Sequence, residues 1–152
     1  LFAQHPAVEF QEGLPDVSKF DGSEPVLLII DDLMNEINSD TEKIFTRMSH
    51  HRNISVVFIT QNLFPKNKFA RTMSLNAHYM VLFKNPRDAG QFAVLAKQMY
   101  PNSSKFAVEA YKDATDCPYG YLLLDMKPET DERFRLRTNI FPEENTCVYI
   151  KK

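Results

Sequence analysis

Polar residues stand where two apolar runs of the sequence end. Asp31 and Asp32 follow the run Val26–Ile30, and Gln61 follows the run Ile54–Thr60. Apolar runs without polar alternation are typical of parallel strands covered on both faces, and α/β proteins gather their chemistry at the carboxyl ends of such strands. There, one carboxylate can hold Mg²⁺, a second can orient or deprotonate water, and an amide can contact that water and the terminal phosphate. The pattern indicates a nucleotide-hydrolysing site; the alternative is that the two acids only cap a turn.

The composition is that of an ordinary globular domain. The chain has 152 residues, of which 43% are hydrophobic and 25% charged, with a net charge of −2. That length fits a single domain over residues 1–152, and the balance excludes disorder, collagen-like repeats and coiled coil. No apolar run reaches the roughly 18 residues of a membrane span. The cysteines Cys117 and Cys147 belong to no metal-binding cluster and indicate intracellular thiols, although a single bridge between them is an alternative.

Strands and helices alternate along the sequence. Turn-forming residues over Ala7–Ser23 predict a loop with at most one short helix. Ser39 and Glu42 form a capping box that begins a helix ending near His50. Further elements are expected as strands over His78–Phe83, Tyr119–Asp125 and Arg133–Asn139, as helices over Pro86–Tyr100 and Ser104–Tyr111, and as a basic loop over Pro65–Ser74. The alternation predicts a three-layer α/β fold with a mainly parallel sheet.

Three segments, in this order, resemble one known family: VLLIIDDLMNE, HHRNISVVFITQN and SLNAHYMVLFKNPRD. They resemble the genome-packaging ATPases of the FtsK–HerA superfamily, in the branch carried by large DNA viruses and by Polinton/Maverick-like or adintovirus-like elements. The resemblance runs from about Glu12 to Pro142. It implies a P-loop NTPase-like fold of the RecA/ASCE type, truncated at the N-terminus, to which the Lys127–Glu132 turn before the last expected strand adds a C-terminal β-hairpin. It also implies that Val26–Asp31 is the Walker B strand, with Asp31 as the Mg²⁺-side carboxylate and Gln61 as the polar sensor that ends strand 54–61.

The resemblance also implies candidates for the catalytic groups. Asp32 stands where the superfamily usually has a catalytic Glu, and Asp is one methylene shorter. Glu36 is a second candidate for activating water, because it lies one turn on if a helix begins near Asp32. Arg47 and Arg52 lie where the superfamily supplies an arginine finger to a neighbouring subunit, and of the two we prefer Arg52. The alternative is a surface arginine or a cation that complements a helix C-terminus.

The middle of the chain is basic: residues 41–112 carry a net charge of +8, although folding can mix these charges over the surface. Lys66, Lys68 and Arg71 lie in the expected basic loop, where they would hold DNA phosphates in the channel of a ring-shaped motor. The alternative is a solvated connecting loop.

Three more basic residues recur at every second position of the last expected strand, at 133, 135 and 137. On one face of a half-exposed edge strand, these arginines would form a basic stripe or a charged edge that discourages aggregation.

The sequence contains no phosphate cradle. A P-loop needs GxxxxGK[ST], and none of the four glycines begins one. Because the chain begins with Leu1 rather than Met, we expect it to be a piece of a longer protein whose P-loop lies upstream. We expect this piece alone neither to bind ATP tightly nor to turn it over.

The resulting hypothesis is part of an ATP-driven DNA-packaging and translocating motor. Its cofactors would be ATP and Mg²⁺. Its partners would be double-stranded DNA, further copies of itself in a ring and capsid proteins, with no membrane. We expect it inside the cell, in a viral factory or the host nucleus, and not secreted.

Two alternatives from other functional classes stay open. A metal-dependent nuclease could use Asp31, Asp32 and Asp125 as a carboxylate cluster, because Asp125 also ends an expected strand and two-metal cleavage needs carboxylates from different strands. A non-catalytic module could instead keep the ATPase fold as a docking platform, which the missing P-loop favours for this piece.

Overall fold

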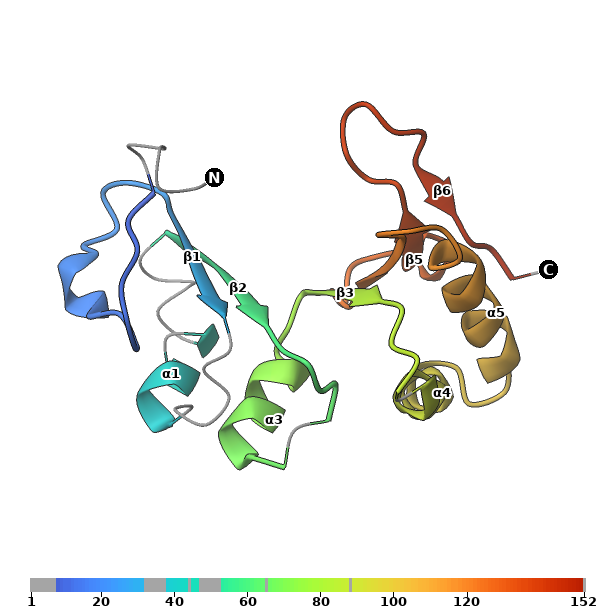
Figure 1. Ribbon diagram of the computed structural model, residues 1–152, viewed down its shortest axis with the longest axis horizontal. Coiled ribbons are helices and arrows are strands. Elements are labelled where there is room, and N and C mark those ends of the chain that lie inside the picture. The colour runs from blue at the N-terminus through green and yellow to red at the C-terminus, as the bar shows by residue number, and fades with distance from the viewer. Residues whose placement is uncertain are drawn as a thin grey trace. The chain divides into compact units, whose positions relative to one another are not determined.

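The computed structural model describes residues 8–31, 38–43, 45–46, 53–64, 66–87 and 89–151. It is a mixed α/β protein whose chain divides into two compact units, Leu1–Asn76 and Ala77–Lys152. Each unit has its own sheet and its own helices (Figure 1). Whether the two units form the one domain expected over residues 1–152 stays a prediction.

The first unit contains a two-stranded parallel sheet. Its elements are the short 3-10 helix η2 (Val17–Lys19), β1 (Val26–Asp31), α1 (Ser39–Lys43), β2 (Ile54–Ile59) and α3 (Lys68–Leu75). β1 and β2 pair in register, with Val26 opposite Ile54 and Asp31 opposite Ile59. Both predicted strands, their parallel orientation and the short helix in the N-terminal loop are therefore confirmed.

Among the described residues, packing is seen on one face of this sheet. Along β1 the exposure alternates: Leu27 and Ile29 are 63% and 58% exposed, whereas Ile30 is buried. On the packed side, Phe58 of β2 contacts the buried pair Ala70 and Met73 of α3. The expectation of strands covered on both faces is therefore wrong for the part of the chain that the structure describes, where helices pack on one side alone.

The helices of the first unit differ from the prediction in two places. α1 is capped by Asn38 instead of Ser39, since the Asn38 carbonyl accepts from the Glu42 amide and its Oδ1 accepts from the Asp40 amide at 2.8 Å. The segment expected as a basic loop contains α3, which begins after Asn67. The Asn67 side chain accepts from the Phe69 amide at 2.9 Å and caps the helix. The loop prediction was wrong because an Asn cap and two buried residues at i, i+3 are enough to begin a short amphipathic helix.

The second unit contains a four-stranded antiparallel sheet in the order β3-β4-β5-β6. Its elements are β3 (Tyr79–Phe83), α4 (Ala89–Met99), α5 (Ser104–Ala114), β4 (Tyr121–Asp125), the 3-10 helix η4 (Glu132–Phe134), β5 (Leu136–Thr138) and β6 (Cys147–Val148). The expected hairpin between β4 and β5 is confirmed. The expectation of a mainly parallel sheet holds only for β1 and β2, because every pairing in this unit is antiparallel.

The core of the second unit lies between α5 and the sheet. Every residue of β4 is buried, and α5 packs against β4 and β5. α5 presents Ala107, Ala110 and Ala114 as its buried residues, and such small side chains allow a helix to approach a sheet closely. Gly120 precedes β4 in an equally tight place, where an added Cβ would lie 2.5 Å from the Ala114 carbonyl oxygen.

β5 is an inner strand, because β6 pairs with its outer side. The prediction of an edge strand over Arg133–Asn139 was therefore wrong. The pairing partner is two residues long and follows an exposed stretch, so the sequence pattern carried little signal for it. Among the described helices of both units, none has the length and apolar character that crossing a bilayer requires.

Candidate functional site

The carboxyl ends of β1 and β2 meet at one end of the parallel sheet. Asp31 is the last residue of β1 and lies opposite Ile59, and Gln61 follows two residues after Ile59. Both side chains are exposed, and neither forms a hydrogen bond or an ion pair with another described residue. The Asp31 carboxylate and the Gln61 amide are therefore available to bind a ligand at the same end of the sheet.

A tight turn after β2 holds the backbone around Gln61. The Asn62 amide donates to Thr60 Oγ1 at 3.2 Å, and the Thr60 hydroxyl donates to the Asn62 carbonyl at 3.1 Å. Asn62 Oδ1 accepts from the Phe64 amide at 2.9 Å. Asn62 therefore stabilises the turn with its side chain, whereas the side chain of Gln61 stays exposed.

Four of the predicted catalytic residues lie outside the described residues: Asp32, Glu36, Arg47 and Arg52. Their roles as water-activating carboxylates and as arginine fingers stay predictions.

The basic residues predicted to bind DNA are presented by α3 and the turn before it. Lys66, Lys68 and Arg71, here called the α3 basic set, are all exposed. Lys68 and Arg71 lie one turn apart on the helix and are exposed, whereas Ala70 and Met73 are buried. The Lys68 ammonium lies 4.8 Å from the centroid of the Phe69 ring, so a cation–π contact holds it near the helix start.

Asp125, the third carboxylate of the nuclease alternative, is 4% exposed at the end of β4. Its Oδ2 accepts from the Arg137 guanidinium at 2.5 Å, and its Oδ1 accepts from the Lys127 amide at 3.2 Å. Both oxygens are thus engaged within the second unit, whereas Asp31 belongs to the first. In the nuclease alternative the Asp125 carboxylate would have to bind a metal ion, and the metal would compete with the Arg137 guanidinium for it.

The basic stripe predicted over positions 133, 135 and 137 is wrong. Arg133 belongs to η4 and pairs with Asp131 at 2.8 Å. Arg135 pairs with Glu132 at 2.6 Å and donates to two backbone carbonyls, and Arg137 pairs with Asp125. The stripe does not form because the strand is only three residues long and each arginine has an acidic partner.

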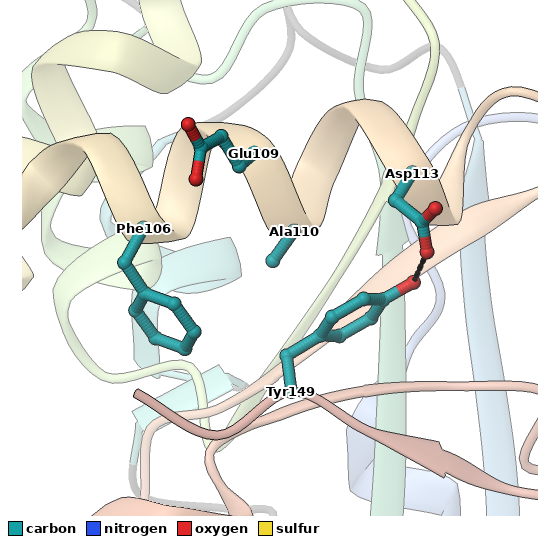
Figure 2. Close-up of a pocket in the computed structure, with 5 residues that line it drawn as sticks. All are labelled: Phe106, Glu109, Ala110, Asp113 and Tyr149. Carbon is teal, nitrogen blue, oxygen red and sulfur yellow. Dashed lines mark hydrogen bonds between the residues drawn. The ribbon is translucent and has the colours of Figure 1, made fainter. Parts of the chain in front are cut away.

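Sequence reasoning missed a small cavity beside α5, shown in Figure 2. The cavity measures about 210 Å³ and is lined by Phe106, Glu109, Ala110, Asp113 and Tyr149. The Tyr149 hydroxyl donates to Asp113 Oδ2 at 2.7 Å. Burial and this hydrogen bond raise the pKa of Tyr149 well above its usual range. In the sequence, only the spacing of Phe106, Ala110 and Asp113 on one side of α5 could have signalled the cavity. The residues around Tyr149 in the sequence give no sign that its side chain packs against this side of α5.

The two cysteines, Cys117 and Cys147, are both free and exposed, as expected for unpaired thiols. Comparison of the chain with protein-family models, with curated proteins and with solved structures finds no match.

Proposed function

We propose that the chain is part of an ATP-driven DNA-packaging motor and supplies the hydrolysis side of its nucleotide site. The observation that supports this most is the parallel register of β1 and β2, with Asp31 opposite Ile59 and Gln61 just beyond. In nucleotide hydrolases a carboxylate and a polar amide act from neighbouring strand ends. The first unit offers that pair, and neither side chain has a hydrogen-bond or ion-pair partner among the described residues.

The donor set fits a hydrated magnesium ion. Mg²⁺ prefers oxygen ligands, keeps several waters and binds through one or two carboxylates together with substrate phosphates. Asp31 offers such a carboxylate, and its exposure leaves room for water molecules and phosphate oxygens. When bound, Mg²⁺·ATP would supply the phosphoryl group and neutralise part of its charge. Asp31 would hold the ion, and Gln61 would orient water toward the terminal phosphate.

The proposal extends to the fold and to the partners. In the whole motor, β1 and β2 would belong to the central sheet of a three-layer α/β fold of the P-loop NTPase type. The exposed α3 basic set would contact the phosphates of double-stranded DNA without reading sequence. We further propose a homo-oligomeric ring that works with capsid proteins in a viral factory or the host nucleus.

Paramagnetic NMR tests the proposal on the chain itself. Mn²⁺·ATP at millimolar concentration is added to the ¹⁵N-labelled chain, and line broadening is mapped by residue. We expect broadening at Asp31 and over residues 60–62, and its loss in Asp31→Asn, because the amide cannot supply the negative charge. Millimolar probe concentration detects the weak binding expected without a phosphate cradle.

The matched control is Glu24→Gln. Glu24 is exposed and precedes β1 at the amino end of the strand, opposite to Asp31, so this variant should leave the broadening unchanged. Broadening that is absent from residues 31 and 60–62, or that persists in Asp31→Asn, would overturn the proposal and favour a non-catalytic docking module.

A further inference from the structure

The cavity beside α5 combines an apolar floor with an acidic rim. Phe106, Ala110 and Asp113 lie at i, i+4 and i+7 of the helix and therefore share a side of it. Tyr149 comes from the segment after β6. Figure 2 shows the rings of Phe106 and Tyr149 on the two sides of Ala110, with the Tyr149 hydroxyl directed at Asp113. The hollow exists because Ala110, whose side chain is a single methyl group, lies between two larger residues.

One side of the rim is held rigidly. The hydrogen bond from Tyr149 to Asp113 Oδ2 fixes both the ring and the carboxylate. The second oxygen of Asp113 accepts no hydrogen bond from another described residue. It therefore keeps its full capacity to accept from a donor that enters the cavity.

The other side of the rim carries a second carboxylate, from Glu109. Glu109 lies one turn before Asp113, and its ion-pair partner is Lys105 at 3.7 Å. Both side chains of that pair are mostly exposed, at 65% and 89%, so the pair contributes little and leaves the carboxylate free to turn toward a ligand. Glu109 and Asp113, one turn apart on α5, thus both line the cavity, and Figure 2 shows the Glu109 carboxylate turned away from Tyr149.

We propose that this cavity binds an arginine side chain of a partner polypeptide. Its volume of about 210 Å³ is below the roughly 300–1,000 Å³ of small-molecule sites, which favours a single side chain. The aliphatic stem would lie on Phe106 and Ala110, and the planar guanidinium would stack on the Tyr149 ring. Its five donors can reach both Glu109 and Asp113, whereas the compact ammonium of lysine is a point charge.

The test uses the full ¹⁵N-labelled chain and two probes of matched shape. Nα-acetyl-arginine methylamide carries the charge, and Nα-acetyl-citrulline methylamide is its neutral isostere. We expect the arginine probe to shift the amide signals of residues 106–113 and of Tyr149, with a dissociation constant on the order of 1 mM. The citrulline probe should bind at least about fivefold more weakly, because it lacks the charge-assisted hydrogen bonds.

Variants then assign the binding to the rim. Glu109→Gln and Asp113→Asn should each weaken binding of the arginine probe about three- to tenfold, and the double variant should abolish it. Glu143→Gln removes an exposed carboxylate that does not line the cavity and should leave binding unchanged. Dispersed amide signals in each variant show that it is folded.

Three outcomes would overturn the proposal. Equal affinity of the arginine and citrulline probes would show that the carboxylates of the rim do not contribute to binding. Binding that survives the double variant would place the probe elsewhere. Nα-acetyl-lysine methylamide serves as a third probe, and if it bound as tightly as the arginine probe, the cavity would be a general cation site instead of an arginine site.

Discussion

The buried ion pair between Asp125 and Arg137 yields a prediction that separates a structural role from a metal-binding one. Asp125→Asn keeps the shape of the side chain, so it creates no cavity, but it removes the negative charge beside Arg137. Removing one partner of a buried pair costs about 3–5 kcal/mol, and a hydrogen bond to a charged group contributes about 1.5–3 kcal/mol. Because the Arg137 side chain is 27% exposed, water screens part of this loss. We expect the free energy of unfolding to fall by about 2–3 kcal/mol.

Urea unfolding followed by circular dichroism measures this change, with the slope of free energy against urea checked for each variant. The control is Asp116→Asn, which removes the same charge from a pair with Lys84 at 3.8 Å whose side chains are 87% and 61% exposed. That variant should change the free energy by less than about 1 kcal/mol. The reasoning is refuted if the two variants are equally stable. Loss of Mn²⁺ binding in Asp125→Asn at unchanged stability would instead favour the nuclease alternative.

Four further predictions concern both units. The first replaces all three residues of the α3 basic set by Gln. Fluorescence anisotropy then measures how the logarithm of the binding constant for duplex DNA falls with the logarithm of the salt concentration, and the magnitude of that slope should decrease by about 3. An unchanged slope would show that this set does not contact DNA. The hydrogen bond from Arg133 lowers the pKa of Asp131 to about 2, so carboxyl ¹³C NMR should show it titrating there. The ion pair of Asp131 with Arg133 then stabilises the fold above about pH 4, and its contribution is lost as the pH falls through 2. The variant Arg133→Gln should return the pKa of Asp131 toward 3.8. Gly120→Ala should destabilise the second unit by about 1–3 kcal/mol, because the backbone before β4 must shift, and thermal unfolding measures it. Met73→Ala should cost the first unit about 2–4 kcal/mol in chemical unfolding, since Met73 is 2% exposed, and a cost near zero would show that α3 does not pack as described.

The positions of the strands could be predicted because residue type alone carries that signal. The run Val26–Ile30 became β1, and Ile54–Thr60 became β2 with one residue fewer. Their parallel pairing was also predictable, because a helix-forming segment lies between them and a crossover is needed to return the chain in the same direction. The relation between Asp31 and Gln61 followed from these two inferences.

The pairing partners of the other strands could not be predicted from the same signal. β4, with the sequence YLLLD, is an apolar run that ends in Asp125 and is buried throughout, yet both neighbouring strands pair with it antiparallel. β1 is a similarly apolar run, yet its side chains alternate between exposed and partly or fully buried. An apolar run indicates that a strand can be buried. The direction in which the strand pairs and the elements that pack on its two faces depend on segments far away in the sequence.

The interactions that define the second unit join residues that no local pattern connects. Tyr111 donates to the Phe83 carbonyl at 2.9 Å, Thr138 donates to the Tyr121 carbonyl at 2.6 Å, and Tyr149 reaches Asp113 across 36 positions of the chain. Each joins a polar side chain to a partner at least 17 positions away in the chain. Motifs in the sequence therefore favoured the carboxylate and amide at the ends of β1 and β2, whereas the arginine cavity rests on tertiary contacts alone. Because the two proposals rest on different units and different side chains, Asp31→Asn should leave arginine binding intact, and Asp113→Asn should leave the Mn²⁺·ATP broadening intact.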